Sequence, residues 1–345
     1  MGQFTTENET PFAVEVLALS DEEMRPILTV VVKATYSLVE GAPRLAKTQM
    51  PVNVAGEFRG VPETSSYKFE PECAFIKPAT DVVLTGHAHT PMSKVSEVLV
   101  DLRVGALRKT VRVLGERTWF KSVGQVLMTK PLPFEKIPLS YERAFGGWDK
   151  TDKDPDKHRY EPRNPVGVGF RASARHFEEG LRLPNLEEPE QPLRSFGQVV
   201  PPAGFGFVSP HWQPRAAFGG TYDKNWDMTR KPLLPKDFDR RFFNAASTGL
   251  VAAGYLRGDE PVLVDNASPR GRLSFRLPGQ PAPRVTITQA GAKDVTPDMR
   301  LDTVILDTDE DHLLILWRGH LALPGTLHDV RSIAIHAEGV STKGA

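Results

Sequence analysis

The sequence predicts a mostly β protein with an antiparallel β-sandwich or barrel-like sheets, long ordered loops rich in proline and glycine, and few short helices. Three observations support this fold class: runs of β-branched residues with a period of two, turn-forming residues between the runs, and no amphipathic stretch of about ten or more residues between consecutive early strands. Such spacing favours a sandwich or barrel over a parallel α/β sheet. The 30 prolines and 28 glycines indicate many turns, and a hydrophobic fraction of 40% indicates a folded chain.

Residues 1–145 are expected to form an N-terminal antiparallel β unit. Two long strand candidates fill residues 12–39, on either side of a polar, turn-like stretch at 20–26. In the second candidate every other residue from Leu28 to Leu38 is apolar, so one face of this strand should line the core. Further strand candidates, which together read as a meander with a short turn at residues 105–106, lie at 81–89, 95–104, 109–116 and 123–129.

Residues 146–257 are expected to form a loop-rich region, because proline, glycine and asparagine occur there too often for a regular helix or strand to form. The best helix candidate in this region is 239–255, although its apolar periodicity is weak. Loops of this length inside a compact domain are uncommon and are usually functional.

Residues 258–345 are expected to form a C-terminal β unit that packs on the first, so that the chain makes one compact globule. Turn signals separate its strand candidates, which lie at residues 261–264, 272–277, 284–289, 302–307, 312–321 and 331–337. The acidic stretch at 308–311 is the expected turn of a hairpin.

The charge balance and the cysteine count exclude several functional classes. Lys plus Arg and Asp plus Glu number 43 each, so the chain lacks the strong positive field expected of a protein that binds nucleic acid or a membrane surface. Cys73 is the single cysteine, which excludes an internal disulfide and a multi-cysteine zinc site. The N-terminal residues lack the pattern of a signal peptide, and the expected location is therefore the cytoplasm.

No cofactor and no metal ion are expected. His87 and His89 would share one face of a strand, but tetrahedral zinc needs further ligands that the sequence does not supply nearby. The chain also lacks a nucleophile elbow and a complete glycine-rich nucleotide loop, so no catalytic residue is predicted.

Acidic and aromatic residues gather in two parts of the middle of the chain, around residues 142–149 and 222–230. Glu142, Asp149, Asp223 and Asp227 lie near tryptophans and a tyrosine, a mixture that suggests a sugar cleft with two working carboxylates. The alternative, which we favour, is that these carboxylates tie loops together, with Glu142 acting beside Arg143 and Asp223 pairing with Arg230.

Five motifs in the middle of the chain resemble those of a known family. They are PLSYERAFGG at 138–147, RNPVGVGF at 163–170, LPNLE at 183–187, PAGFG at 202–206 and GTYDKNWDMTRKPLLPKDFDRRFFNAA at 220–246. In this order they resemble a bacterial family catalogued as a domain of unknown function, whose members are encoded beside type VI secretion genes. One departure is the stretch at 247–250, where the family pattern has a proline followed by an Asp-Gln pair.

The resemblance implies a non-enzymatic adaptor or chaperone, which binds an effector toxin and loads it onto the valine-glycine-repeat spike protein, VgrG. It supplies no catalytic residues and does not assign the partner-binding residues. We expect structural roles first for the shared motif residues, which are Glu142, Arg143, Gly146, Gly147, Asn164, Gly167, Asp223, Trp226, Arg230, Asp237 and Asp239. The alternative function is a glycan-binding or glycan-cleaving protein that uses the aromatic and acidic cluster at 222–230.

Overall fold

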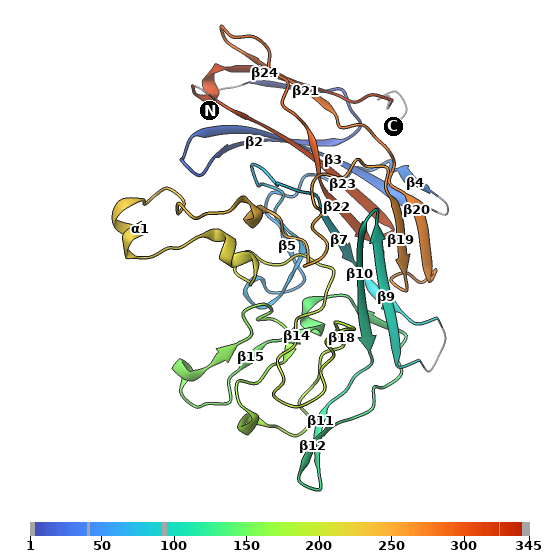
Figure 1. Cartoon of the computed structure of the whole chain (residues 1–345). Coiled ribbons are helices and arrows are strands. Elements are labelled where there is room, and N and C mark those ends of the chain that lie inside the picture. Colours follow the sequence, from blue (N-terminus) through green and yellow to red (C-terminus); the bar gives the residue numbers. More distant parts are fainter. Residues whose placement is uncertain (1–3, 40–41, 92–94, 324, 340–345) are drawn as a thin grey trace.

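The computed structural model describes residues 4–39, 42–91, 95–323 and 325–339, and it confirms the predicted β-rich fold class. Within these ranges the strands form eight sheets, and the helices are short. The molecule is elongated, with the larger sheets towards one end and the loop-rich region towards the other (Figure 1).

The largest sheet combines strands from both ends of the chain. Its order is β2-β3-β23-β22-β7, with β4 paired to the end of β3. The strands are β2 (Ala13–Ser20), β3 (Pro26–Val39), β4 (Ala42–Leu45), β7 (Asp81–Thr85), β22 (Arg300–Asp307) and β23 (His312–Ala322). All pairs are antiparallel except β22 with β7, which run parallel. The first and the last thirds of the chain therefore share one sheet.

Two further sheets also mix distant parts of the chain. The five-stranded sheet has the order β18-β10-β9-β19-β20 and the three-stranded sheet the order β1-β24-β21. Their bounds are β9 (Glu97–Val104), β10 (Leu107–Leu114), β18 (Leu186–Glu187), β19 (Pro261–Asp265) and β20 (Arg272–Arg276), then β1 (Thr5–Asn8), β21 (Arg284–Gln289) and β24 (Val330–His336). Gly105, with a φ of 57°, makes the expected turn between β9 and β10.

The remaining elements are short and belong mostly to loops. The two-stranded sheets pair β5 (Glu57–Phe58) with β6 (Tyr67–Phe69), β8 (His87–His89) with β13 (Lys136–Pro138), β11 (Trp119–Ser122) with β12 (Gln125–Met128), β14 (Phe145–Gly146) with β17 (Val168–Gly169), and β15 (Trp148–Asp149) with β16 (Arg159–Tyr160). The α-helix is α1 (Lys224–Thr229), and the 3₁₀ turns are η1 (Pro62–Thr64), η2 (Tyr141–Arg143), η3 (Pro155–Lys157), η4 (Ala174–His176), η5 (Arg215–Gly219), η6 (Arg240–Phe243) and η7 (Leu327–Asp329).

Two expectations about local structure are wrong. The strand candidates at 81–129 do not form a meander, because β7 pairs with β22 and β8 pairs with β13. Of the strands in this range, β9 with β10 and β11 with β12 form hairpins between neighbours. The predicted helix at 239–255 is absent, apart from the single turn η6. This segment instead lies against β7, where the amide of Val82 donates to the carbonyl oxygen of Leu250 at 2.9 Å. Its backbone groups are thus paired without a helix.

Strand β3 is buried on both faces, whereas its alternation predicted one core face. Thr29, Lys33 and Thr35 on the polar face are at most 1% exposed. Lys33 forms an ion pair with Glu72 at 2.7 Å, and the side chain of Gln49 hydrogen-bonds both backbone groups of Thr35. The segment between β4 and β7 therefore covers this face and supplies the polar partners that buried groups require.

One large hydrophobic core joins the sheets, and a smaller cluster stabilises the loop-rich region. The large core draws on β3, β7, β9, β10, β22, β23 and β24. The smaller cluster contains Trp119, Phe145, Leu183, Leu193 and Val200. The loop-rich region is therefore packed and not merely attached to the sheets.

Candidate docking site

Residues 141–147 and 164–169, which we call the loop tie, bring two of the motifs together. The side-chain amide of Asn164 donates to the carbonyl oxygens of Tyr141 and Phe145, at 2.8 and 3.0 Å. The amide of Gly147 donates to the carbonyl oxygen of Asn164 at 2.8 Å. Asn164 is fully buried, and its side-chain amide pairs backbone carbonyl groups of the segment that leads into β14, the strand that pairs with β17.

The glycines of the loop tie are required by close chain approach. A Cβ atom added at Gly146, whose φ is +153°, would lie 2.1 Å from the carbonyl oxygen of Asn164. At Gly147 it would lie 2.3 Å from the carbonyl oxygen of Gly167, and at Gly167 it would lie 2.4 Å from Nδ2 of Asn164. No other residue fits these positions without movement of the backbone.

Glu142 and Arg143 do not pair with each other. The carboxylate of Glu142 accepts hydrogen bonds from the backbone amide and the hydroxyl of Ser66, at 2.6 and 3.0 Å. Arg143 instead pairs with Glu116 at 2.7 Å. The two neighbours therefore do not interact with each other as predicted. Glu142 binds a residue 76 positions away in the chain, and Arg143 binds one 27 positions away.

Residues 220–239, which we call the arm, project from the body with α1 at the tip (Figure 1). The carboxylate of Asp223 caps α1 by accepting a hydrogen bond from the amide of Trp226 at 2.8 Å. The indole of Trp226 donates to the carbonyl oxygen of Leu233 at 2.9 Å, and its ring packs edge-on against Tyr222. Internal bonds therefore fix the tip of the arm.

Two aspartates, Asp237 and Asp239, form the hydrogen bonds at the base of the arm. Asp237 accepts hydrogen bonds from the amide and the hydroxyl of Thr221, at 3.0 and 2.7 Å, so the two chain ends of the arm are joined. Asp239 caps η6 through the amide of Arg241 and pairs with the guanidinium of the same residue. Hydrogen bonding lowers the pKa of both aspartates, as expected for carboxylates that accept several bonds.

Arg230 anchors the arm to the turn between β2 and β3. Its guanidinium binds Glu23 at 2.5 Å and the carbonyl oxygen of Leu234 at 2.7 Å. The predicted pairing of Arg230 with Asp223 is therefore wrong, because Asp223 is engaged as a helix cap. Arg240, the residue that follows the arm, pairs with Glu22 of the same turn at 2.5 Å.

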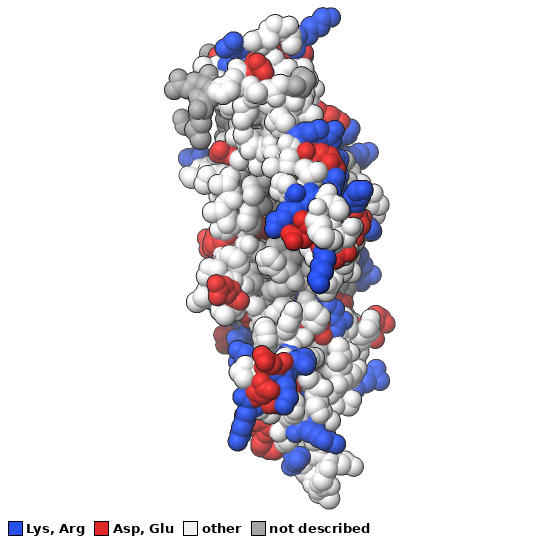
Figure 2. Space-filling view, turned by 90° about the vertical axis from the view of Figure 1, so that its left-hand side faces the viewer, with Lys and Arg blue, Asp and Glu red and all other residues white. Residues whose placement is uncertain are grey.

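The tip of the arm presents apolar side chains to solvent. Met228 is 78% exposed and Tyr222 is 56% exposed, and Trp226 lies half-buried between them in sequence. Figure 2 looks onto the face from which the arm projects, where basic and acidic side chains are intermixed at mid-height. The arm is thus a rigid, mixed-charge projection with an apolar tip.

The four carboxylates of the proposed sugar cleft have separate partners. Glu142 binds Ser66 and Asp223 caps α1, while Asp149 lies 2.6 Å from Nδ1 of His176 and Asp227 pairs with Lys231 at 3.0 Å. Among the described residues no two of these four share a hydrogen-bond partner.

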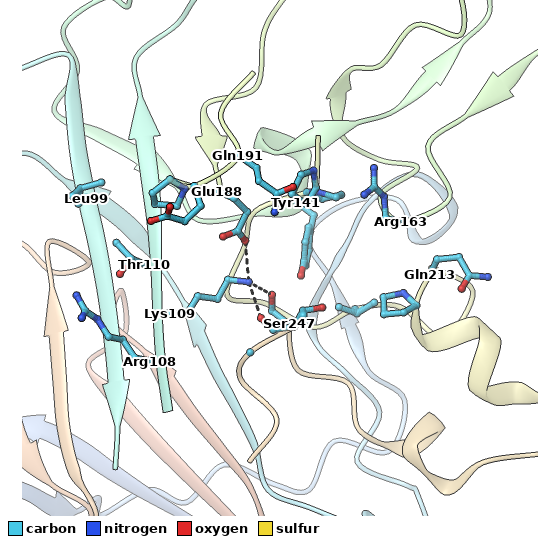
Figure 3. Close-up of a pocket in the computed structure, with 18 residues that line it drawn as sticks. Leu99, Arg108, Lys109, Thr110, Tyr141, Arg163, Glu188, Gln191, Gln213 and Ser247 are labelled. Atoms are coloured by element: carbon cyan, nitrogen blue, oxygen red, sulfur yellow. Dashed lines mark hydrogen bonds and ion pairs between the residues drawn. The ribbon is translucent and has the colours of Figure 1, made fainter. Parts of the chain in front are cut away.

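A cleft of about 760 Å³ lies between β10 and the proline-rich loops, and sequence reasoning did not identify it. The ammonium of Lys109 lies at its centre, where it donates to the Ser247 hydroxyl and to the Thr248 carbonyl oxygen, both at 2.9 Å, and lies 3.3 Å from Glu188 (Figure 3). Burial lowers the pKa of Lys109, although Glu188 opposes this shift. Lys109 thereby connects β10 with the two loops that border the cleft.

Residues 23–318 match the model of a bacterial family described as an uncharacterized protein conserved in bacteria, DUF2169. The chain belongs to this family. No curated protein and no solved structure matches the chain. In this DUF2169 protein the matched residues include the loop tie, the arm and the Lys109 cleft, whereas Glu22, which anchors Arg240, lies one position before the match.

The histidine pair of β8 lies beside a carboxylate of the β22–β23 turn. Nδ1 of His87 is 2.8 Å from Asp309, and the rings of His87 and His89 are 6.4 Å apart. Within the described ranges no three His, Cys, Asp or Glu side chains gather as a metal site would require. The helices in these same ranges are too short or too polar for any of them to cross a membrane.

Proposed function

We propose that this DUF2169 protein is a cytoplasmic, non-enzymatic adaptor that binds a type VI effector toxin and loads it onto the VgrG spike protein. The proposal starts from the motif resemblance, which implies a carrier of effectors. Its support in the structure is the arm, because five of the motif residues form hydrogen bonds that hold this projection in place. These residues are Asp223, Trp226, Arg230, Asp237 and Asp239.

The arm has the properties of a preformed protein-binding element. It is held by hydrogen bonds at its tip and base, so binding would not have to order it. It exposes Tyr222 and Met228, and aromatic and methionine side chains are enriched at protein interfaces. A hydrophobic tip surrounded by charged residues matches the pattern of an anchor inside a polar rim.

The glycan alternative also relies on the arm, because the half-exposed Tyr222 and Trp226 could stack on a sugar ring. The two proposals predict different consequences for the carboxylates. A glycosidase needs two carboxyl groups across one substrate, whereas Asp223 and Glu142 are already engaged as a helix cap and as a loop tie. We therefore favour the adaptor.

The test is affinity capture of the tagged chain from the bacterium that encodes it, at physiological salt, with the captured proteins identified by mass spectrometry. The adaptor proposal expects an effector toxin and a VgrG spike protein in the captured fraction. Recovery of neither protein would refute it. Binding on a glycan array or turnover of peptidoglycan, lost on replacement of Asp223 without unfolding, would support the glycan alternative instead.

A further inference from the structure

The outer edge of β10 is open where the strand borders the cleft. β10 pairs with β9 from Leu107 to Leu114, but β18 covers only Arg112 and Val113 on the other side. Among the residues that the structure describes, no strand pairs with Arg108 or Thr110 on that side.

The backbone groups of Arg108 and Thr110 point outwards from this edge. In an antiparallel ladder, successive residues direct their N–H and C=O groups to opposite sides. The amide of Leu114 donates to the carbonyl oxygen of Asn185, on the β18 side, at 2.8 Å. By alternation, Thr110 and Arg108 point to that same side. Two donors and two acceptors at strand spacing therefore face the cleft.

A proline explains why the chain's own strand does not cover this edge. In the β18–β10 register Glu187 lies opposite Arg112 and Leu186 opposite Val113. Continued in the same register, residue 189 would lie opposite Thr110 and would have to donate its amide to the ladder. That residue is Pro189, which has no N–H. β18 therefore ends, and the chain leaves the edge to become a wall of the cleft.

The cleft beside the edge has the character of a peptide groove. Its far wall is built from prolines contributed by three loops, namely Pro189, Pro201, Pro202 and Pro214. Tyr141 adds an aromatic surface, and Leu99 adds an exposed apolar side chain on the β9 side. Lys109 fixes the floor through its bonds to Ser247 and Thr248 (Figure 3).

We infer that the cleft binds an extended polypeptide segment of a partner protein, which adds to the sheet as a strand beside Arg108 and Thr110. This inference rests on the proposed function, since the cargo of an adaptor is a polypeptide. Unpaired backbone donors and acceptors at strand spacing are complementary to the backbone of another strand, and the adjacent pockets accept its alternate side chains. The surface is separate from the arm and gives the protein a second contact region.

The probe is a phage-displayed library of random peptides of about ten residues, long enough to span the open edge. Peptides enriched on the purified full-length chain are synthesised with a fluorophore, and their affinities are measured by fluorescence polarisation. We expect enriched peptides that bind the wild type and bind Thr110→Pro at least about tenfold more weakly, because proline removes the outward amide and blocks the approach of a strand.

Matched variants separate the open edge from general damage. Thr110→Val loses the hydroxyl that donates to Asp101 but keeps the backbone amide, so it should bind the peptides much more tightly than Thr110→Pro does. Ser274→Pro places a proline on the opposite free edge of the same sheet, in β20, and should leave binding unchanged. Thr248→Trp fills the cleft from an exposed position and tests the site independently if Thr110→Pro fails to fold, with Thr248→Ser as its control.

The inference is overturned if the library yields no enriched peptide, or if the peptides bind Thr110→Pro and Thr248→Trp as tightly as the wild type. Failure of the proposed function would look different. Peptides would then bind the cleft in the expected way, while capture from the bacterium would recover neither toxin nor spike protein.

Discussion

The ammonium of Lys109 and the hydroxyl of Ser247 lie 2.9 Å apart although 138 residues separate them in the chain. The hydroxyl of Ser247 in turn donates a hydrogen bond to the carbonyl oxygen of Gly204 at 2.7 Å, so a single line of hydrogen bonds connects β10, the loop after η6 and the PAGFG motif. This line passes through the stretch at 247–250, whose residues Ser247, Thr248 and Gly249 line the cleft.

Replacing Lys109 with methionine should destabilise the protein by about 1–3 kcal/mol, because Thr248 and Glu188 would lose a buried donor. The urea midpoint of unfolding measures the effect. The exposed Lys236 serves as the control, and Lys236→Met should change the stability by less than about 0.5 kcal/mol. Equal midpoints for both variants would show that Lys109 does not hold the cleft together.

An alanine at Gly146 should prevent normal folding or cost more than about 4 kcal/mol, because its Cβ atom would overlap the carbonyl oxygen of Asn164. Gly124 is the matched control, since it also has a positive φ, of +77°, but an added Cβ there meets nothing within 4 Å. Gly124→Ala should cost only about 1 kcal/mol through its backbone conformation. Soluble yield and thermal unfolding distinguish the two, and a Gly146→Ala protein as stable as Gly124→Ala would contradict the tight approach.

The carboxylate of Asp149 should stabilise the folded protein at neutral pH and lose part of this contribution at low pH. Burial alone would raise the pKa of Asp149, but hydrogen bonds from His176, Thr151 and Ala172 outweigh burial and lower it. Because the folded pKa lies below the unfolded value, the contribution is full above the unfolded pKa of about 3.9 and is lost as the pH falls towards the folded pKa.

The comparison of wild type and Asp149→Asn at pH 5 and pH 3 measures this contribution. The wild type should be the more stable of the two at pH 5, and its advantage should shrink at pH 3. Asp294→Asn removes an exposed carboxylate and serves as the control, which should follow the wild type at both values. An advantage that stays constant between the two pH values would exclude the proposed role of the Asp149 carboxylate.

Arg230→Ala should loosen the arm without unfolding the body, because it removes the bonds to Glu23 and to the carbonyl oxygen of Leu234. Hydrogen–deuterium exchange should become faster across residues 220–236 and stay unchanged in β3 and β23. Arg257, which is 81% exposed and pairs with Asp259, supplies the control Arg257→Ala. Unchanged exchange in the arm would mean that the arm is rigid without its anchor.

The strands were predictable where a run of β-branched and other apolar residues is bounded by turn-forming residues. The runs at 28–38, 302–307 and 312–321 lie in β3, β22 and β23, as the sequence indicated. Strand partners were not predictable, since β7 pairs in parallel with a strand more than 200 residues later, and no local pattern encodes that choice. Lys33 in the alternating run looked like a solvent-facing residue, because its partner Glu72 lies in a loop 39 residues away.

The motif residues could be recognised from the sequence, but their partners could not. Asp223 and Arg230 have opposite charges seven positions apart, which suggested a pair. The short helix between them uses Asp223 as its cap and leaves Arg230 free to reach Glu23. The cleft gave no sequence signal, because Lys109 looked like one polar position in a strand and the open edge arises from Pro189 in a distant loop.

The exposed tip of the arm tests the account most directly. The double variant Tyr222→Ala, Met228→Ala removes both apolar side chains and leaves the bonds that fix the arm in place, while Val123→Ser removes a fully exposed apolar side chain from the β11–β12 turn as the control. Affinity capture from the encoding bacterium, quantified by mass spectrometry, should recover toxin and spike protein with the wild type and the control and at least about tenfold less with the double variant. Equal recovery of these partners by all three proteins would contradict docking through the arm.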